Sequence, residues 1–143
     1  MPISEFHYKR RVQFAETDAS GIVHFSNFFR YAEEAEHAMW RVAGLAIERE
    51  QSEFAWPRVA ASFEYRKPLQ FEDEVDVHLR IVAKTAKTFR YAAVLLKDGV
   101  IVAEGSHTTI CVRKRPGLPP KAVDMPADID ARFEVAPSGA ASV

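Results

Sequence analysis

The sequence predicts an α+β fold in which one long helix packs against a curled antiparallel sheet of about five strands. Only the stretch from Ser26 to Gly44 repeats its apolar residues at the three- and four-residue spacing of a helix. Most of the remaining chain alternates apolar with polar residues, which is the pattern of half-buried strands. A chain of 143 residues suits a single domain.

The first strand is expected over residues 6–14. Phe6, Tyr8 and Val12 alternate with polar neighbours there, and Arg10 is the exception to the apolar series. The AETDASG segment that follows is rich in turn residues and contains two carboxylates and a glycine. It therefore predicts a loop between the first strand and the helix.

The helix is expected to start at Ser26 or Asn27, either of which can cap its first turn, and to end at Gly44. A short second helical stretch is expected over 45–53. The face that the long helix buries is predicted to consist of Phe28, Ala32, Ala35, Met39 and Val42.

The rest of the domain is expected to be strands joined by short connections. The dipeptide Asp98-Gly99 is a strong two-residue hairpin signal between two of them. We expect the domain to occupy residues 1–130 and a partly disordered tail to occupy 131–143. The expected strands cover 57–65, 75–81, 89–96 and 100–112.

One strand, one helix and then four strands is the order of the hotdog fold. A single curled sheet leaves open edges, so we expect a homodimer or homotetramer with sites at the subunit interface. Nineteen basic against twenty acidic residues argue against a nucleic-acid partner. No apolar run is long enough to cross a membrane and the first residues do not resemble a signal peptide, so we expect a cytoplasmic protein without membrane insertion.

The segment from Phe14 to Trp40 is the most informative for chemistry. It places Glu16 and Asp18 in a loop that leads into a helix N-terminus, where free backbone N–H groups attract negative charge. A carboxylate beside such donors can support acyl transfer, since it pairs a nucleophile or base with an oxyanion site. The alternative is that Asp18 only closes a turn that Gly21 permits.

This segment resembles the 4-hydroxybenzoyl-CoA thioesterase family of hotdog acyl-CoA thioesterases, and the resemblance extends to about residue 130. The family motif reads approximately D-x-x-G-h-V/I-x-x-x-N-Y, with an acidic residue and an alanine on the following helix. The matching residues are Asp18, Gly21, Ile22, Val23, Asn27, Phe28, Glu33 and Ala35.

The resemblance implies that Asp18 attacks the thioester or activates water, and that the backbone N–H of Phe25 polarises the thioester carbonyl. It also implies that Gly21 and Asn27 shape the loop and the helix entry. The family commonly has other aromatic or histidine residues where His24, Phe25 and Phe28 stand, so the resemblance leaves the acyl group open.

Other candidates have two interpretations each. His24 can contact the substrate, orient water or cap the helix, and Glu33 can serve as an alternative base or simply pair on the helix surface. Glu34 and His37 form one Glu-x-x-His unit without a second copy, so no metal is expected. A lone Cys111 excludes an intrachain disulfide and is expected to pack in the core.

The phosphates of coenzyme A require basic contacts, although each candidate can also be an ordinary solvated strand end. Phe25, Phe28 and Trp56 are expected to line the acyl pocket, with residues of a partner subunit. The residues expected to bind the rest of the substrate are Asn27, Arg66, Lys67, Lys87, Thr88, Arg90 and Lys121.

The sequence therefore predicts an acyl-CoA thioesterase that releases a carboxylic acid and free CoA, with no cofactor of its own. Two alternatives remain. One is a hotdog hydratase or dehydratase, which would use a histidine paired with an acidic residue, and only His24 is placed for that role. The other is an acyl-CoA-binding hotdog protein without catalysis.

Overall fold

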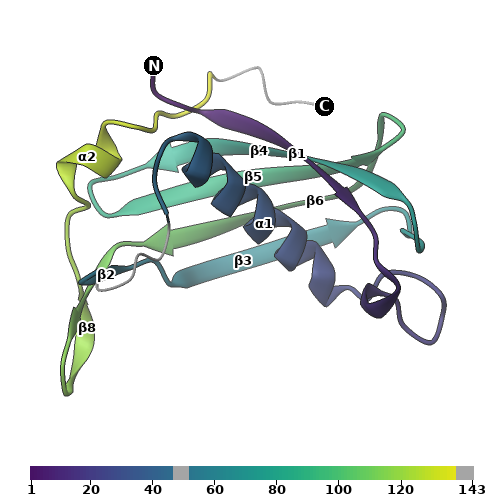
Figure 1. Ribbon diagram of the computed structural model, residues 1–143, viewed down its shortest axis with the longest axis horizontal. Helices are drawn as coiled ribbons and strands as arrows, with labels where there is room; N and C mark the ends of the chain where they lie inside the picture. Colours follow the sequence, from purple (N-terminus) through teal and green to yellow (C-terminus); the bar gives the residue numbers. More distant parts are fainter. Residues whose placement is uncertain (47–51, 138–143) are drawn as a thin grey trace.

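A computed structural model describes residues 1–46 and 52–137. Its main sheet is antiparallel, with five strands in the order β1-β4-β5-β6-β3, and the helix α1 (Ser26–Val42) lies across one face of it (Figure 1). This part of the predicted α+β architecture is confirmed. The strands are β1 (Glu5–Arg11), β3 (Arg58–Tyr65), β4 (Glu74–Lys84), β5 (Thr88–Lys97) and β6 (Val100–Ile110).

The helix α1 buries the face that its spacing predicts, except at its last turn. Phe28, Ala32, Ala35 and Met39 are buried, whereas Val42 is 64% exposed. The helix is capped by neither Ser26 nor Asn27, since Phe25 occupies the N-cap position and makes no side-chain cap bond. Gly44 follows the helix with φ +82°, as expected for a glycine that ends a helix.

The first strand is shorter than predicted, because β1 ends at Arg11 and a single 3₁₀ turn, η1 (Phe14–Glu16), follows it. The Arg10 exception has a structural cause. Its side chain points to the same face as Phe6 and Tyr8, where it forms ion pairs with Glu16 and Glu34. A cation thus occupies an inward position because two carboxylates meet it there.

The strand β3 lies at the open edge of the main sheet and pairs only with β6 within the chain. Its Phe63 and Tyr65 rings pack against Phe28 of α1, with the Phe28 and Tyr65 ring centroids 5.0 Å apart. Val59 on the same strand is 60% exposed. The strand therefore covers the helix on one side and presents an unpaired backbone edge on the other.

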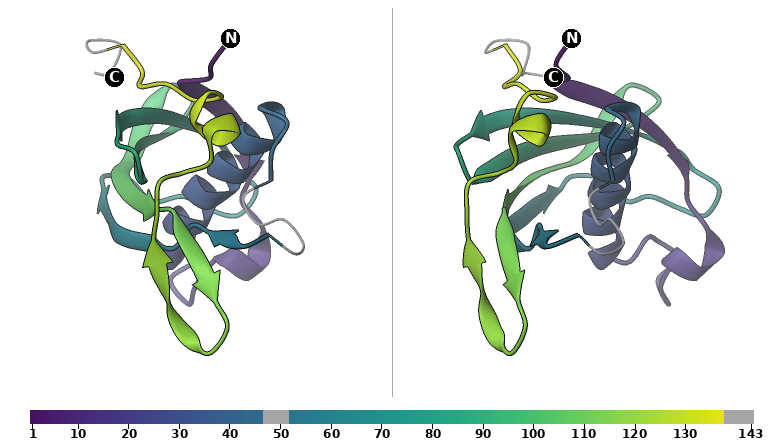
Figure 2. Two further views of the ribbon diagram at one scale, coloured as in Figure 1. Left: turned by 90° about the vertical axis from the view of Figure 1, so that its left-hand side faces the viewer. Right: turned by 60° about the vertical axis from the view of Figure 1, so that its left-hand side comes forward.

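A second, three-stranded sheet was not predicted. It consists of β2 (Phe54–Ala55), β7 (Val112–Arg115) and β8 (Leu118–Ala122), and its β7–β8 hairpin projects from one end of the molecule (Figure 2). The predicted strand 100–112 is broken at Cys111, which separates β6 from β7. Of the helix predicted over 45–53, residues 47–51 lie outside the described residues, and the described ends are not helical.

Residues just after the predicted domain boundary at residue 130 pack against the core. After the short helix α2 (Ala127–Asp130), Phe133 is buried in the core and pairs with Ile3, and the Ala136 N–H donates to the Ile81 carbonyl at 2.8 Å. Residues 131–137 therefore belong to the domain, and 138–143 lie outside the described residues. Within the described part of the chain, no helix is long and apolar enough to cross a membrane.

Candidate active site

The loop between η1 and α1 is a narrow antiparallel turn around Asp18. Thr17 bridges Val23, and the Asp18 N–H donates to the Ile22 carbonyl at 2.9 Å. The Ser20 N–H donates to Asp18 Oδ1 at 2.8 Å, so the turn contact expected of an aspartate is present. Gly21 has φ +80° in open space, so backbone conformation explains this glycine.

Asp18 lines a cavity of about 510 Å³ at the end of the sheet where this loop lies. Its side chain is exposed, and within the described residues only Oδ1 has a hydrogen-bond partner. The turn contact therefore leaves Oδ2 available to a bound molecule. The other lining residues are Ile22, Val23, Phe25, Phe28, Tyr65, Arg66, Lys67 and Pro68.

The Phe25 N–H is a free donor beside this cavity. Its neighbours are all engaged: the His24 N–H donates to the Glu16 carbonyl at 2.9 Å, and the Asn27 N–H to the His24 carbonyl at 2.9 Å. The Ser26 N–H donates to the His24 ring at 3.3 Å. Across the described part of the chain, the Phe25 N–H has no acceptor. An unsatisfied N–H at a helix N-terminus is suited to an oxyanion.

The second loop carboxylate, Glu16, is occupied by the protein itself. It forms an ion pair with Arg10 and accepts hydrogen bonds from the Tyr31 hydroxyl and the Gln13 N–H, both at 2.8 Å. Burial, followed by the hydrogen bond to Glu16, raises the pKa of Tyr31, which remains a protonated donor. Glu16 therefore holds the loop in place, and Asp18 is the loop carboxylate that remains available to contact a bound substrate.

His24 and Asn27 support the loop and do not line the Asp18 cavity. The His24 ring is 2.8 Å from Ser26 Oγ and accepts from the Ser26 N–H, so it closes the first turn of α1. The Asn27 side chain is buried and donates to the Glu16 carbonyl at 3.0 Å. The cavity therefore lacks the histidine that a hydratase would need among the described residues.

Glu33 lies on a different cavity, of about 130 Å³, between α1 and β3. Its carboxylate is 3.5 Å from Arg58 Nη2. One turn further along the helix, Glu36 is fully buried and bonded to Arg58 and to His107 Nε2, the latter at 2.9 Å. The sequence gives no signal for this buried cluster, since its members come from three separate elements.

Arg66 and Lys67, two of the residues predicted to bind the substrate, line the Asp18 cavity. The Arg66 guanidinium already forms an ion pair with Glu104 at 2.6 Å. Lys67 is exposed and has no carboxylate partner among the described residues. Lys67 is therefore the cation most available to a ligand in this cavity.

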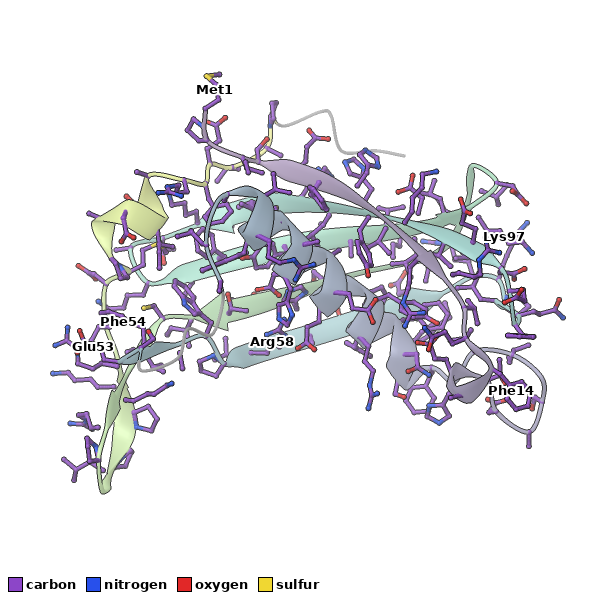
Figure 3. The ribbon with its side chains drawn as sticks, viewed as in Figure 1. Met1, Phe14, Glu53, Phe54, Arg58 and Lys97 are labelled. Carbon is purple, nitrogen blue, oxygen red and sulfur yellow. The ribbon has the colours of Figure 1, made fainter. Side chains whose placement is uncertain are left out.

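Figure 3 labels Phe14 at one end of the molecule and Phe54 at the other. The remaining predicted binding residues lie toward the Phe54 end, since Thr88 pairs with Ile110 and Phe54 with Arg113, whereas Tyr65 pairs with Ala103. Lys87 pairs with Asp124 at 2.5 Å, and the Thr88 hydroxyl is 2.6 Å from that of Thr85. Arg90 reaches Ser106 Oγ at 3.5 Å, and Lys121 is exposed on β8. Within one chain, none of these lines the Asp18 cavity.

Two further residues behave as core residues. Trp56 is buried against Trp40, with ring centroids 5.2 Å apart, and does not line the cavity to which the sequence assigned it. Cys111 is fully buried, as predicted, and burial raises the pKa of its thiol. A protonated, enclosed thiol is a packing group.

Comparison with known proteins gives a consistent result. The family model of the Thioesterase-like superfamily matches residues 12–133. A putative esterase from Aquifex aeolicus is 39% identical over 110 residues, which cover 76% of this chain and 85% of the relative. A 1,4-dihydroxy-2-naphthoyl-CoA hydrolase from Synechocystis is 29% identical over 122 residues, which cover 80% and 88%.

A crystal structure of a hypothetical protein from Aquifex aeolicus matches the fold with a TM-score of 0.83 and 34% identity, covering 90% of this chain and 99% of the other. The resemblance found in the sequence is thus confirmed at the level of the family, and the predicted enzyme class is that of the named hydrolase relatives.

Proposed function

Because the chain belongs to the Thioesterase-like superfamily, we propose that it hydrolyses an acyl-CoA thioester at the Asp18 cavity, releasing a carboxylic acid and free CoA. One observation carries the proposal. Asp18, which has a carboxylate oxygen without a partner among the described residues, and Phe25, whose backbone N–H has no acceptor there, line the same cavity. These are the two groups that acyl transfer from a thioester requires.

The thioester carbonyl oxygen is proposed to accept a hydrogen bond from the Phe25 N–H, which stabilises the negative charge as the carbonyl carbon becomes tetrahedral. Asp18 either attacks that carbon or removes a proton from the water that attacks it. In both routes the carbon–sulfur bond breaks and the sulfur leaves as the thiolate of CoA. Direct attack leaves the acyl group on Asp18 as a mixed anhydride, which water then hydrolyses to the acid and the free carboxylate, whereas in the other route the attacking water itself supplies the oxygen of the acid.

The acyl group is proposed to be aromatic. Phe25, Phe28 and Tyr65 supply three aromatic side chains to the cavity wall, and a planar ring packs well against such a surface. The named Synechocystis relative is a hydrolase of an aromatic acyl-CoA. The Phe28 ring packs against Tyr65, which also lines the cavity, and against Phe63, which does not, so these contacts fix the position of Phe28 in the wall.

The complete site is proposed to need a second copy of the chain. The Tyr65 end of β3 borders the Asp18 cavity. The Arg58 end of β3 lies near Thr88 of β5, because Arg58 and Thr88 pair with the neighbouring residues Thr109 and Ile110 at the end of β6. Two β3 strands that pair antiparallel about a two-fold axis place opposite ends together. Lys87 and Thr88 of one copy would then approach the cavity of the other.

The Asp18→Asn variant tests the assignment of the carboxylate. An amide oxygen still accepts the Ser20 N–H, so the loop should keep its shape, but an amide neither attacks a thioester nor accepts a proton from water. We expect kcat with an aromatic acyl-CoA to fall by about a thousandfold. Release of the CoA thiol measures it, and circular dichroism measures the fold.

Asp98→Asn is the matched control, since Asp98 occupies the β5–β6 turn and does not line the Asp18 cavity, and asparagine tolerates its φ of +51°. It should retain wild-type turnover. If Asp18→Asn retains turnover and Glu33→Gln loses it, the base is the helix carboxylate and the assignment to Asp18 is wrong. Tight binding of acyl-CoA without any turnover in the wild type would identify a binding protein instead.

A further inference from the structure

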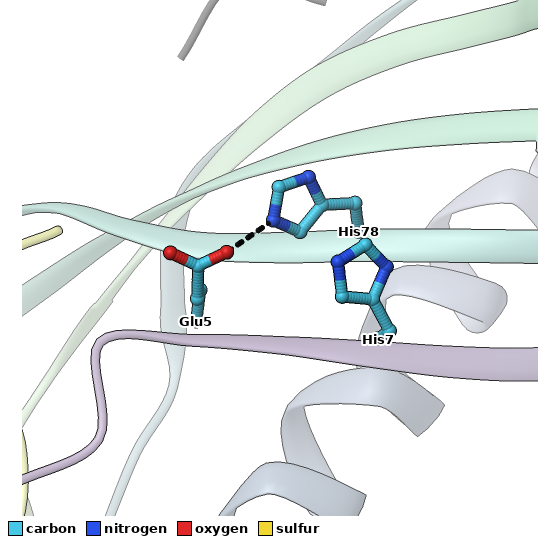
Figure 4. A group of neighbouring side chains, drawn as sticks. All are labelled: Glu5, His7 and His78. Atoms are coloured by element: carbon cyan, nitrogen blue, oxygen red, sulfur yellow. Dashed lines mark hydrogen bonds and ion pairs between the residues drawn. The ribbon is translucent and has the colours of Figure 1, made fainter. Parts of the chain in front are cut away.

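Glu5, His7 and His78 form a cluster on the sheet face opposite to α1 (Figure 4). Glu5 and His7 are two residues apart on β1 and share one face, and His7 is directly opposite His78 on β4. One ligand atom from each of the three residues lies within 4.8 Å of the other two. None of these residues takes part in the proposed thioesterase site.

The cluster is arranged as a set of metal ligands with an outer partner. His78 Nε2 is 2.9 Å from Glu5 Oε1, and the two imidazole rings stack with centroids 4.1 Å apart. His7 Nδ1 donates to Asp76 Oδ1 at 3.3 Å, which leaves Nε2 of the same ring with its lone pair free. A carboxylate that holds one nitrogen of a histidine while the other binds metal is a common feature of zinc sites.

We propose that Glu5, His7 and His78 bind a divalent cation of the zinc type. Two imidazoles and one carboxylate match the ligand chemistry of Zn²⁺, which binds nitrogen and carboxylate oxygen at about 2.0–2.2 Å and leaves a fourth position for water. Ligand atoms around such an ion are about 3.3 Å apart. Glu5 and His7 have side chains 41% and 57% exposed, so they can rotate inward while His78 stays fixed.

The charges around the cluster set the expected strength of binding. Glu5 and Asp76 supply two negative charges, whereas Arg80, which is opposite Glu5 on the same face, supplies a positive one. Lys9 lies opposite Asp76 but is within ion-pair distance of Glu74, at 3.8 Å. The cation would take the place of the hydrogen bond between His78 Nε2 and Glu5 Oε1.

The cation would join β1 to β4. Glu5 and His78 are 73 residues apart in sequence, so the unfolded chain does not bring the three ligands together. A cation that binds only the folded chain stabilises it. The site would thus fasten the first strand to the sheet, at the edge opposite to β3.

Isothermal titration of EDTA-treated protein with ZnCl₂ tests the proposal. We expect one saturable site per chain in the wild type and at least about tenfold weaker binding in His7→Gln and in His78→Gln. Asp76→Ala should weaken binding by about tenfold, because it removes the group that orients His7. At a zinc concentration 100 times the Kd, the Tm of the wild type should rise by about 5–10 °C.

His37→Gln is the matched control, since His37 lies on α1 and outside the cluster, and it should bind zinc like the wild type. Asp18→Asn should also bind normally, because the two sites are separate. Binding that is unchanged in either His7→Gln or His78→Gln overturns the proposal, as does the absence of saturable binding in the wild type. Circular dichroism of each variant without zinc confirms that it is folded.

Discussion

Glu16 and Asp18 are separated by one residue in the same loop, yet their surroundings give them different tasks. Glu16 is bonded to Arg10, Tyr31 and Gln13, so its oxygens are committed to holding the loop. Asp18 keeps one oxygen without a partner among the described residues and faces the cavity. The sequence identified both carboxylates, but only their hydrogen-bond partners separate the structural one from the catalytic candidate.

Glu36 shows what a buried charge requires. Its side chain has no exposed surface and is met by His107 Nε2 at 2.9 Å and by Arg58. Arg58 is 29% exposed and has Glu33 as a second partner, at 3.5 Å, so it is less dependent on Glu36 than His107 is. Removing one member of such a cluster leaves the other in a poorly solvated position.

We expect Glu36→Leu and His107→Leu each to lower the free energy of unfolding by about 3 kcal/mol, because each leaves a buried polar partner unpaired. The double variant should lose clearly less than the sum of the two, since it removes both polar groups together. Urea denaturation of the four proteins measures this coupling. Strictly additive losses would show that the two side chains do not stabilise each other.

At the scale of elements, the close approach of β3 and β6 depends on a glycine. A Cβ on Gly105 would lie 2.2 Å from the Ser62 carbonyl oxygen and 2.7 Å from the Phe63 ring. Phe63 packs against Phe28, which lines the Asp18 cavity. The spacing of these two strands is therefore linked to the position of the cavity wall.

Gly105→Ala should lower the free energy of unfolding by about 1–3 kcal/mol through overpacking, and it should also reduce kcat/KM by shifting Phe63 and the residues behind the cavity. Gly99→Ala is the comparison. Gly99 has φ +77° with no atom near its missing Cβ, so alanine costs about 1 kcal/mol of backbone strain and leaves kcat/KM unchanged. Equal loss of activity in both variants would contradict this link.

The elements that the sequence predicted are those with a local signal. The Asp98-Gly99 turn joins β5 to β6 with positive φ at both residues, and the apolar spacing of α1 identified its buried face up to Met39. The β7–β8 hairpin was not predicted, although Gly117 closes a turn there, because its three prolines break the alternating pattern of a strand. Contacts between distant segments, such as Phe133 with Ile3, leave no local pattern to detect.

The same reasoning explains which site residues could be predicted. Asp18, Phe25 and Phe28 belong to one continuous motif, and the structure places all three on one cavity. Tyr65 was missed because it comes from β3, forty residues from the Phe25 carbonyl that its hydroxyl contacts. The basic residues around Lys87 were proposed from their charge, their places at strand ends and the family resemblance, and these features do not indicate which end of the molecule a residue occupies.

At the scale of the whole molecule, one chain has an unpaired sheet edge, and its predicted binding residues lie at two different ends of the sheet. β3 has a strand on one side only, and exposed apolar side chains occur at both of its ends, Val59 at 60% and Tyr65 at 45% exposure. Phe25, 61% exposed, lies beside Tyr65 and accepts a hydrogen bond from its hydroxyl. An apolar strip along a free edge is a surface for a second strand.

We therefore expect the wild type to be a dimer by light scattering. Val59→Glu should be largely monomeric, because it places a charge on the proposed interface. The single chain should still fold, because Val59 is exposed in it. Since the cavity would lose the second copy's basic residues, kcat/KM should fall by about tenfold or more, mainly through KM. Val100→Glu is the control: it is an exposed apolar residue, 46% accessible, at the β5–β6 turn, and should remain dimeric and active. A fully active monomeric wild type would show that one chain completes the site by itself.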